Sequence, residues 1–325
     1  MIFPKKKWLA AGLAALSLTV SLGAQAEDYP KKLITIMVPF GPGGVADLTV
    51  RLVAQKMAKS MGQPIIIENR PSAGGIVAAN AVAKARPDGY TLFLMSNGTA
   101  VSANLFKKLP FDTQKDFAPI STLGYFDLAV LVNKKVPVKS VADLIAYAKA
   151  NPGKLNIGTI NRGSTQNLAA ELFTSTAGID ALIVPYKGSP EVLTATGTGE
   201  LNVAFEILSP ALPQIRAGNF NAIAVTSGKR FVGLPNVPTV AESGLPGYEA
   251  TSWNALAAPA KTPQAIIDRL TREINAAVSD PDVKARLLTL GIVAQGGTPA
   301  STTKLLATDI AKWGAVIAKA GIEKQ

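Results

Sequence analysis

The chain has 325 residues, of which 48% are hydrophobic and 17% are charged, and its formal net charge is +11. It contains no cysteine and no histidine, which excludes disulfides, thiolate nucleophiles, zinc–cysteine sites, Ser-His-Asp triads and histidine metal ligands. After residue 26, Lys and Arg occur at most as adjacent pairs such as Lys134-Lys135, so we expect no nucleic-acid partner. This composition favours a binding protein over an enzyme, with neither a cofactor nor a metal.

The first 26 residues have the pattern of a secretory signal peptide. Residues 5–7 are lysines, residues 8–23 carry no charge, and Ala24-Gln25-Ala26 supplies the small residues that signal peptidase requires. An apolar stretch of about 16 residues is shorter than the roughly 20 that a membrane-spanning helix needs. Cleavage after Ala26 is therefore favoured over a retained anchor, and we expect a soluble protein exported to the periplasm.

Short apolar runs then alternate with amphipathic segments. Residues 33–38 and 65–67 are expected to be buried strands, and Asp47–Met61 carries the apolar stripe of a helix. An alanine-rich helix is expected at 75–86 and a third strand at 91–95. This βαβ succession is typical of a parallel sheet covered by helices.

The same alternation restarts at Ser140-Val141-Ala142-Asp143, a capping box that opens a helix ending at Ala150. Strands are expected at 155–159, 181–184, 202–205 and 222–226, and helices at 164–177, 190–197 and 210–217. From Pro263 onward the chain is expected to be mostly helical, with Pro281 and Pro299 beginning helices.

Two apolar runs, Leu128–Asn133 and Ser252–Pro259, separate these α/β units, and Pro and Lys follow each run. We interpret them as exposed connectors between two lobes. Residues 27–127 together with 250–325 would form the first lobe, and residues 128–249 the second. The first lobe is then discontinuous, because the C-terminal helices return to it.

Two glycine-bearing turns, one in each lobe, are the main candidates for a binding site. The first covers residues 39–47 and the second residues 158–165, and each lies between a strand and a helix. Glycine allows positive φ and close approach to a ligand, and a helix N-terminus presents unpaired N–H groups to an anion. The first turn has neither the Walker pattern nor the dinucleotide-binding pattern. The alternative is that such turns only reverse the chain.

Ligands of open α/β sheets bind beyond the carboxyl ends of strands. We therefore expect the two turns to face one another across a cleft that holds a carboxylate. Ser96-Asn97-Gly98-Thr99 follows a first-lobe strand and would add polar donors to the same cleft.

Four further residues have two readings each. Tyr186 is either part of the site or a half-buried aromatic, and Arg162 either pairs with a second ligand carboxylate or points into solvent. Asp47 fits a helix-capping role better than a catalytic one. Glu206 would repel a carboxylate, so it suits a ligand amine, a hydroxyl or a bound water, unless it is exposed on a loop.

At these residues the chain resembles the Bug receptors, the periplasmic solute-binding proteins of tripartite tricarboxylate transporters. The matching segments run from about Tyr29 to the C-terminus and are specific only in combination. They are residues 38–44 with Asp47, 68–71, 73–75, 82–84, 87–92, 116–119, 184–188, 234–244 and Trp253.

The resemblance implies a two-lobed type II periplasmic binding protein fold with two crossing strands and a closing cleft. It also implies a carboxylate held largely by backbone amides and ordered waters. By position, the lining residues are Phe40, Gly43, Val45, Asp47, Ser96 and Thr99 on one side, and Thr159, Asn161, Ser164 and Thr165 on the other. Many relatives have Phe-Asp-Asn where this chain has Phe205-Glu206-Ile207, and small residues where it has Arg162. Both departures lie where selectivity is expected to be set.

We therefore predict a monomeric periplasmic receptor that captures a mono- or dicarboxylate for a tripartite tricarboxylate-type permease. One alternative is a ligand-sensing partner of a sensor kinase, which needs the same closed state and is not separated from uptake by sequence. The other is a hydrolase or transferase, which would need a paired acid and base that the sequence does not supply.

Overall fold

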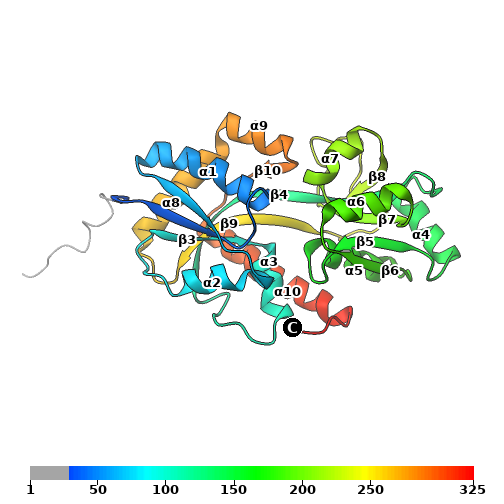
Figure 1. The fold of residues 1–325 in the computed structure, drawn as a ribbon, viewed down its shortest axis with the longest axis horizontal. Helices are drawn as coiled ribbons and strands as arrows, with labels where there is room; N and C mark the ends of the chain where they lie inside the picture. The colour runs from blue at the N-terminus through cyan, green and yellow to red at the C-terminus, as the bar shows by residue number, and fades with distance from the viewer. Residues whose placement is uncertain (1–28) are drawn as a thin grey trace, which may run out of the picture.

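The computed structural model describes residues 29–325, so the signal peptide expected at residues 1–26 lies outside the described residues. Two groups of strands and helices lie side by side, and strands β4 and β9 run between them (Figure 1). Within residues 29–325, every helix is too short or too polar to span a bilayer.

The first group contains the N-terminal strands. Strand β1 (Ile34–Val38) pairs in parallel with β2 (Ile65–Asn69) and β3 (Thr91–Ser96). The helices are α1 (Val45–Met61), a 3₁₀ turn η1 (Ala73–Gly75), α2 (Ile76–Ala83) and α3 (Asn97–Leu105). These strands and helices follow the predicted βαβ order, except that the stretch beginning at Asn97 is a helix and not only a polar turn.

The second group repeats the alternation. Strand β5 (Asn156–Ile160) lies between β6 (Leu182–Tyr186) and β7 (Val203–Ile207), parallel to both, and β8 is Phe220–Val225. The helices are α4 (Val141–Ala150), α5 (Thr165–Ala177), α6 (Ser189–Thr198) and α7 (Leu208–Arg216). Each predicted helix and strand of this region is present, with ends shifted by at most two residues.

The crossing strands are longer and more buried than predicted. Strand β4 (Phe117–Asn133) pairs with β9 (Thr251–Pro259) through Asp127 and with β7 from Leu128 onward. The expectation of exposed connectors is wrong, because both apolar runs are buried β-strands and only the residues after them, such as Lys134, are exposed. An apolar run with strands on both sides is buried by the sheet and its covering helices. The division into lobes at residues 127 and 249 stays a prediction.

The C-terminal region returns to the first group, as expected. It comprises α8 (Gln264–Ser279), α9 (Pro281–Thr289), β10 (Ile292–Ala294) and α10 (Pro299–Lys319). Helix α10 packs against α3 and β4 and also reaches α5 of the second group. Its Trp313 Nε1 donates to Asn97 Oδ1 at 2.6 Å, which ties α10 to the start of α3.

Candidate functional site

A cavity of about 550 Å³ lies between the two groups. Its walls are the turn after β1, η1, the length of α3, and the turn after β5, with Gln325 at its edge. Pockets of roughly 300–1,000 Å³ are typical for small ligands. Both glycine-bearing turns therefore reach one cavity.

The structure brings only some of the predicted residues to this cavity. The six that line it are Phe40, Ser96, Thr99, Asn161, Arg162 and Ser164. The seven that do not line it are Gly43, Val45, Asp47, Thr159, Thr165, Tyr186 and Glu206.

Asp47 organises the first turn from within. Asp47 Oδ2 accepts hydrogen bonds from the Gly43 N–H at 2.9 Å and from Arg51 Nε at 2.8 Å. The other carboxylate oxygen, Oδ1, accepts from Asn69 Nδ2 at 2.8 Å. Burial alone would raise the pKa of Asp47, but the hydrogen bonds from Arg51, Gly43 and Asn69 outweigh it and lower the pKa. Asn69 Nδ2 also donates to the Phe40 carbonyl at 3.0 Å.

This arrangement corrects one expectation about the first turn. The N–H of Gly43 is already engaged by the Asp47 side chain, so it is not a bare donor for a ligand. The turn contributes the Phe40 side chain to the cavity instead. The expected helix-capping role of Asp47 is wrong, because α1 begins after Gly44 with no side-chain cap and the Asp47 carboxylate binds the N–H of Gly43, one residue before the cap.

The N-terminus of α3 supplies the polar end of the cavity. Ser96 is the residue before the helix, and its N–H donates to Thr99 Oγ1 at 3.1 Å. Ser96 is only 3% exposed, and its Oγ faces the Thr99 N–H in a capping box without forming a hydrogen bond of normal geometry to any described residue. The first N–H groups of a helix lack partners within the helix and favour negative charge. The buried hydroxyl and the helix N-terminus thus point to an anionic group.

The Phe40 ring lies close to this polar end. A Cβ added at Gly98 would lie 3.3 Å from Ser96 Oγ and 3.9 Å from the Phe40 ring. The absence of a side chain at Gly98 therefore keeps the space between the hydroxyl and the ring open.

The turn after β5 is held by its own hydrogen bonds. Ser164 Oγ accepts from the Asn167 N–H at 3.1 Å, and Asn167 Oδ1 accepts from the Gly163 N–H at 3.0 Å. Thr159 is fully buried in β5, below this turn. The Gly163 N–H is therefore also engaged and is not a free donor for a ligand.

Two contacts join this turn to α3 across the gap between the groups. Asn97 Nδ2 donates to Thr165 Oγ1 at 2.7 Å. Gly163 has φ +76°, and a Cβ there would lie 2.6 Å from Leu105 Cδ2. Glycine at 163 therefore permits both the left-handed backbone and the close approach of the turn to α3.

Arg162 has the one charged side chain among the residues that line the cavity. It is exposed, and no carboxylate lies within ion-pairing distance of it in residues 29–325. Burial raises the pKa of the nearby Glu171, and the charge of Arg162 opposes that rise. The cavity thus has a positive rim and no acidic side chain in its lining.

Tyr186 and Glu206 lie elsewhere. Tyr186 Oη donates to Glu200 Oε1 at 2.8 Å at the edge strand β6. Glu206 is fully buried at the end of β7, where Oε1 accepts from Gln166 Nε2 at 2.9 Å and from the Ile207 N–H at 2.8 Å. Burial raises its pKa. Glu206 is therefore not an exposed loop residue, and it ties β7 to the start of α5.

Asn254 was missed by sequence reasoning. It lies on β9 directly opposite Ser96 in the antiparallel pairing, fully buried, and neither Nδ2 nor Oδ1 has a partner among the described residues. Opposed residues of paired strands share a face of the sheet, so Asn254 and Ser96 are neighbours. The sequence feature that could have indicated Asn254 is a single amide side chain within the otherwise largely apolar strand β9.

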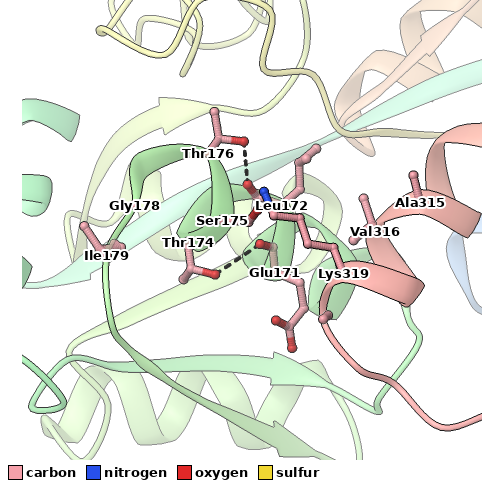
Figure 2. A pocket seen from close by; sticks show the side chains of 11 residues that line it. Glu171, Leu172, Thr174, Ser175, Thr176, Gly178, Ile179, Ala315, Val316 and Lys319 are labelled. Carbon is pink, nitrogen blue, oxygen red and sulfur yellow. Dashed lines mark hydrogen bonds between the residues drawn. The ribbon is translucent and has the colours of Figure 1, made fainter.

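A second hollow of about 490 Å³ lies between α5 and α10. Figure 2 shows Glu171 and Lys319 beside it, with the Thr174 and Thr176 hydroxyls directed at carbonyls of their own helix. It contains none of the predicted site residues. In residues 29–325, moreover, no group of three or more acidic side chains could hold a metal ion. The cavity along α3 is therefore the candidate site.

The sequence model of the tripartite tricarboxylate transporter family receptor matches residues 49–322. This chain belongs to that family. It is 35% identical over 313 residues to protein BugT of Bordetella pertussis, covering 95% of this chain and 96% of BugT. The resemblance to the Bug receptors is thereby confirmed.

Two solved structures with bound organic acids share its fold. Rpa4515 of R. palustris with adipate is 35% identical, with a TM-score of 0.78, covering 91% of this chain and 99% of that one. MatC from Rhodopseudomonas palustris with bound malate is 33% identical, with a TM-score of 0.75, covering 89% and 100%. This tripartite tricarboxylate receptor thus has the two-lobed type II periplasmic binding fold, in a family of binding receptors rather than enzymes.

Proposed function

We propose that this receptor captures a small organic acid in the cavity along α3 and presents it to a tripartite tricarboxylate-type permease. The observation that carries the proposal is the buried Ser96 hydroxyl at the N-terminus of α3, in a cavity whose lining has no Asp or Glu side chain. Adipate and malate in the structures of two relatives support a carboxylate as the ligand class.

The proposed working cycle is a closure of the two lobes, divided after residues 127 and 249, around the acid. The contacts between Asn97 and Thr165 and between Leu105 and Gly163 are those that closure would make and opening would break. A ligand that touches both α3 and the turn after β5 would stabilise the closed state over the open one. The mature protein would act in the periplasm as a monomer, after cleavage at Ala26.

The binding proposal is tested by isothermal calorimetry and thermal shift with a panel of organic acids on the wild type and S96A. Removing the hydroxyl should weaken the best acid about tenfold, because a hydrogen bond to a charged group contributes roughly 1.5–3 kcal/mol. The matched control is S175A, on α5 outside the cavity, and it should bind as the wild type does. No binding by any acid, or equal binding by S96A, would contradict the proposal.

Delivery to a permease is tested genetically in the host. Deletion of the gene should abolish uptake of the acid identified above. Loss of only a transcriptional response, with uptake intact, would instead support the partnership with a sensor kinase.

A further inference from the structure

The hollow between α5 and α10 is separate from the acid cavity. Helix α5 belongs to the second group of strands and helices, and α10 returns to the first. The volume of the hollow, about 490 Å³, is within the range of small-ligand pockets. None of its lining residues also lines the cavity along α3. A molecule bound there would therefore contact both groups without occupying the acid site.

One acidic side chain, Glu171, lies on a wall of this hollow that is otherwise largely apolar. Leu172, Ile179 and Val316 supply the hydrocarbon. Glu171 is half-buried and forms no ion pair with any residue in 29–325. Burial raises its pKa, because the charged form loses water without gaining an ion-pair partner. A ligand cation with an apolar body would supply that partner.

The C-terminal end of α5 adds to the negative potential of the hollow. The lining includes the C-cap residue Gly178, and the last turn of α5 has no basic residue to offset the helix dipole. The hydroxyls of Thr174 and Thr176 donate to carbonyls of their own helix, at 3.1 and 2.7 Å. They are therefore not free donors for an anion.

Lys319 is the competing positive charge in the lining. It lies in the last turn of α10, where a cation offsets the dipole of that helix. Lys319 is exposed, and in Figure 2 its amino group and the Glu171 carboxylate point to different sides of the hollow. An exposed lysine keeps its charge in water, so the part of the hollow at Glu171 favours a cation.

Both helices that form the hollow are hydrogen-bonded to Asn97, the first residue of α3. Asn97 Nδ2 donates to Thr165 Oγ1 at the start of α5, at 2.7 Å, and Trp313 Nε1 of α10 donates to Asn97 Oδ1 at 2.6 Å. Because Asn97 directly follows Ser96, the position of α5 relative to α10 is tied to the polar end of the acid cavity. An occupant that bridges the two helices would stabilise the arrangement in which Asn97 bonds to both.

We propose that this hollow is a second binding site, for a small organic cation with an apolar body, and that its occupancy strengthens acid binding through Asn97. The site itself does not depend on the proposed function, whereas the coupling rests on it. Coupling of two binding equilibria is reciprocal, so the acid should strengthen cation binding by the same factor.

Calorimetry with isoamylamine and its neutral analogue isoamyl alcohol, in the absence of acid, tests the site. The wild type should bind the amine at least about tenfold more tightly than the alcohol, because only the amine pairs with Glu171. E171Q should weaken the amine about tenfold and leave the alcohol within about twofold. The control E323Q removes an equal charge from an exposed residue outside the hollow and should bind the amine as the wild type does. Equal binding of amine and alcohol, or no effect of E171Q, overturns the site.

The variant K319Q distinguishes a cation site from an anion site at the same place. Removing the competing positive charge should leave isoamylamine binding unchanged or make it tighter. Weaker binding of the amine by K319Q would overturn the assignment to a cation.

The coupling is measured by titrating the best acid of the screen with and without saturating isoamylamine. The amine should tighten the acid about fivefold in the wild type. In T165V, which replaces the acceptor for Asn97 by a side chain of similar size, the amine should have almost no effect on the acid. An acid affinity that does not respond to the amine, or a full response in T165V, overturns the coupling through Asn97. If every acid fails to bind, the proposed function and the coupling are both overturned, while the comparison of E171Q with the wild type still decides the site.

Discussion

Asp47 shows how one buried side chain organises the binding turn. It is 2% exposed and satisfies a backbone N–H, a guanidinium and an amide at once. Because Asn69 also holds the Phe40 carbonyl, the order of the cavity's aromatic wall depends indirectly on this carboxylate.

The substitution D47A is expected to lower the free energy of unfolding by about 1–3 kcal/mol, since it removes a buried carboxylate that accepts hydrogen bonds from Gly43, Arg51 and Asn69. Chemical denaturation at pH 7 measures the loss. The control D282A removes an exposed carboxylate from α9 and should change stability by less than about 0.5 kcal/mol. An equal effect of the two variants would refute the role assigned to Asp47.

The contribution of Asp47 to the free energy of unfolding changes with pH in a direction that its pKa shift fixes. Its pKa is lowered in the folded protein, so its contribution is present above the ordinary aspartate pKa and is lost as the pH falls through the lowered value.

At the level of elements, one glycine precedes α5 and another follows it, and the two differ in the space around them. Gly163 and Gly178 both have positive φ, +76° and +61°, at the two ends of α5. A Cβ would meet Leu105 at 2.6 Å in the first case and nothing within 4 Å in the second.

Both alanine variants should therefore lose about 1 kcal/mol of stability from backbone strain, but only G163A should also lose ligand affinity. The reason is that an added Cβ at 163 pushes the turn away from α3, and the proposed ligand would contact both α3 and this turn. Calorimetry with the acid identified in the screen measures the difference. Equal affinity in G163A and G178A would show that the approach of the turn to α3 does not matter for binding.

On the scale of the whole molecule, β4 and β9 carry the connection between the two groups of strands. Asp127 lies at the residue where β4 changes its partner from β9 to β7. It is 6% exposed, and burial, with the charge of Glu249 and against a hydrogen bond from Ser227, raises its pKa to about 6.

A raised carboxyl pKa makes the folded state bind the proton more tightly than the unfolded state. This contribution to stability is thus full below about pH 4 and is lost as the pH rises through about 6. D127N should remove that dependence and raise the free energy of unfolding at pH 7.5 by at most about 3 kcal/mol. Denaturation between pH 4 and 8 measures it, with the exposed D180N as control. A D127N curve with the wild-type slope would contradict this account.

The alternation of strands and helices, the two glycine-bearing turns and the family were predictable from the sequence. Apolar periodicity and turn residues act over a few positions, so they are visible in a local window. The absence of cysteine and histidine likewise excluded disulfides, thiolate nucleophiles and histidine metal ligands directly from the composition. Helix α3 was missed because its first residues, Asn97-Gly98-Thr99, have the composition of a turn.

Only the tertiary structure decided which residues meet. Ser96 lies opposite Asn254, Asn97 bonds to Thr165, and Asp47 bonds to Asn69, in pairs separated by 22 to 158 positions in the chain. Burial, hydrogen-bond satisfaction and pKa depend on such distant partners, which no local pattern encodes. For this reason the sequence determined the type of protein, whereas the packing of α3 against the turn after β5 determined where an acid can be held.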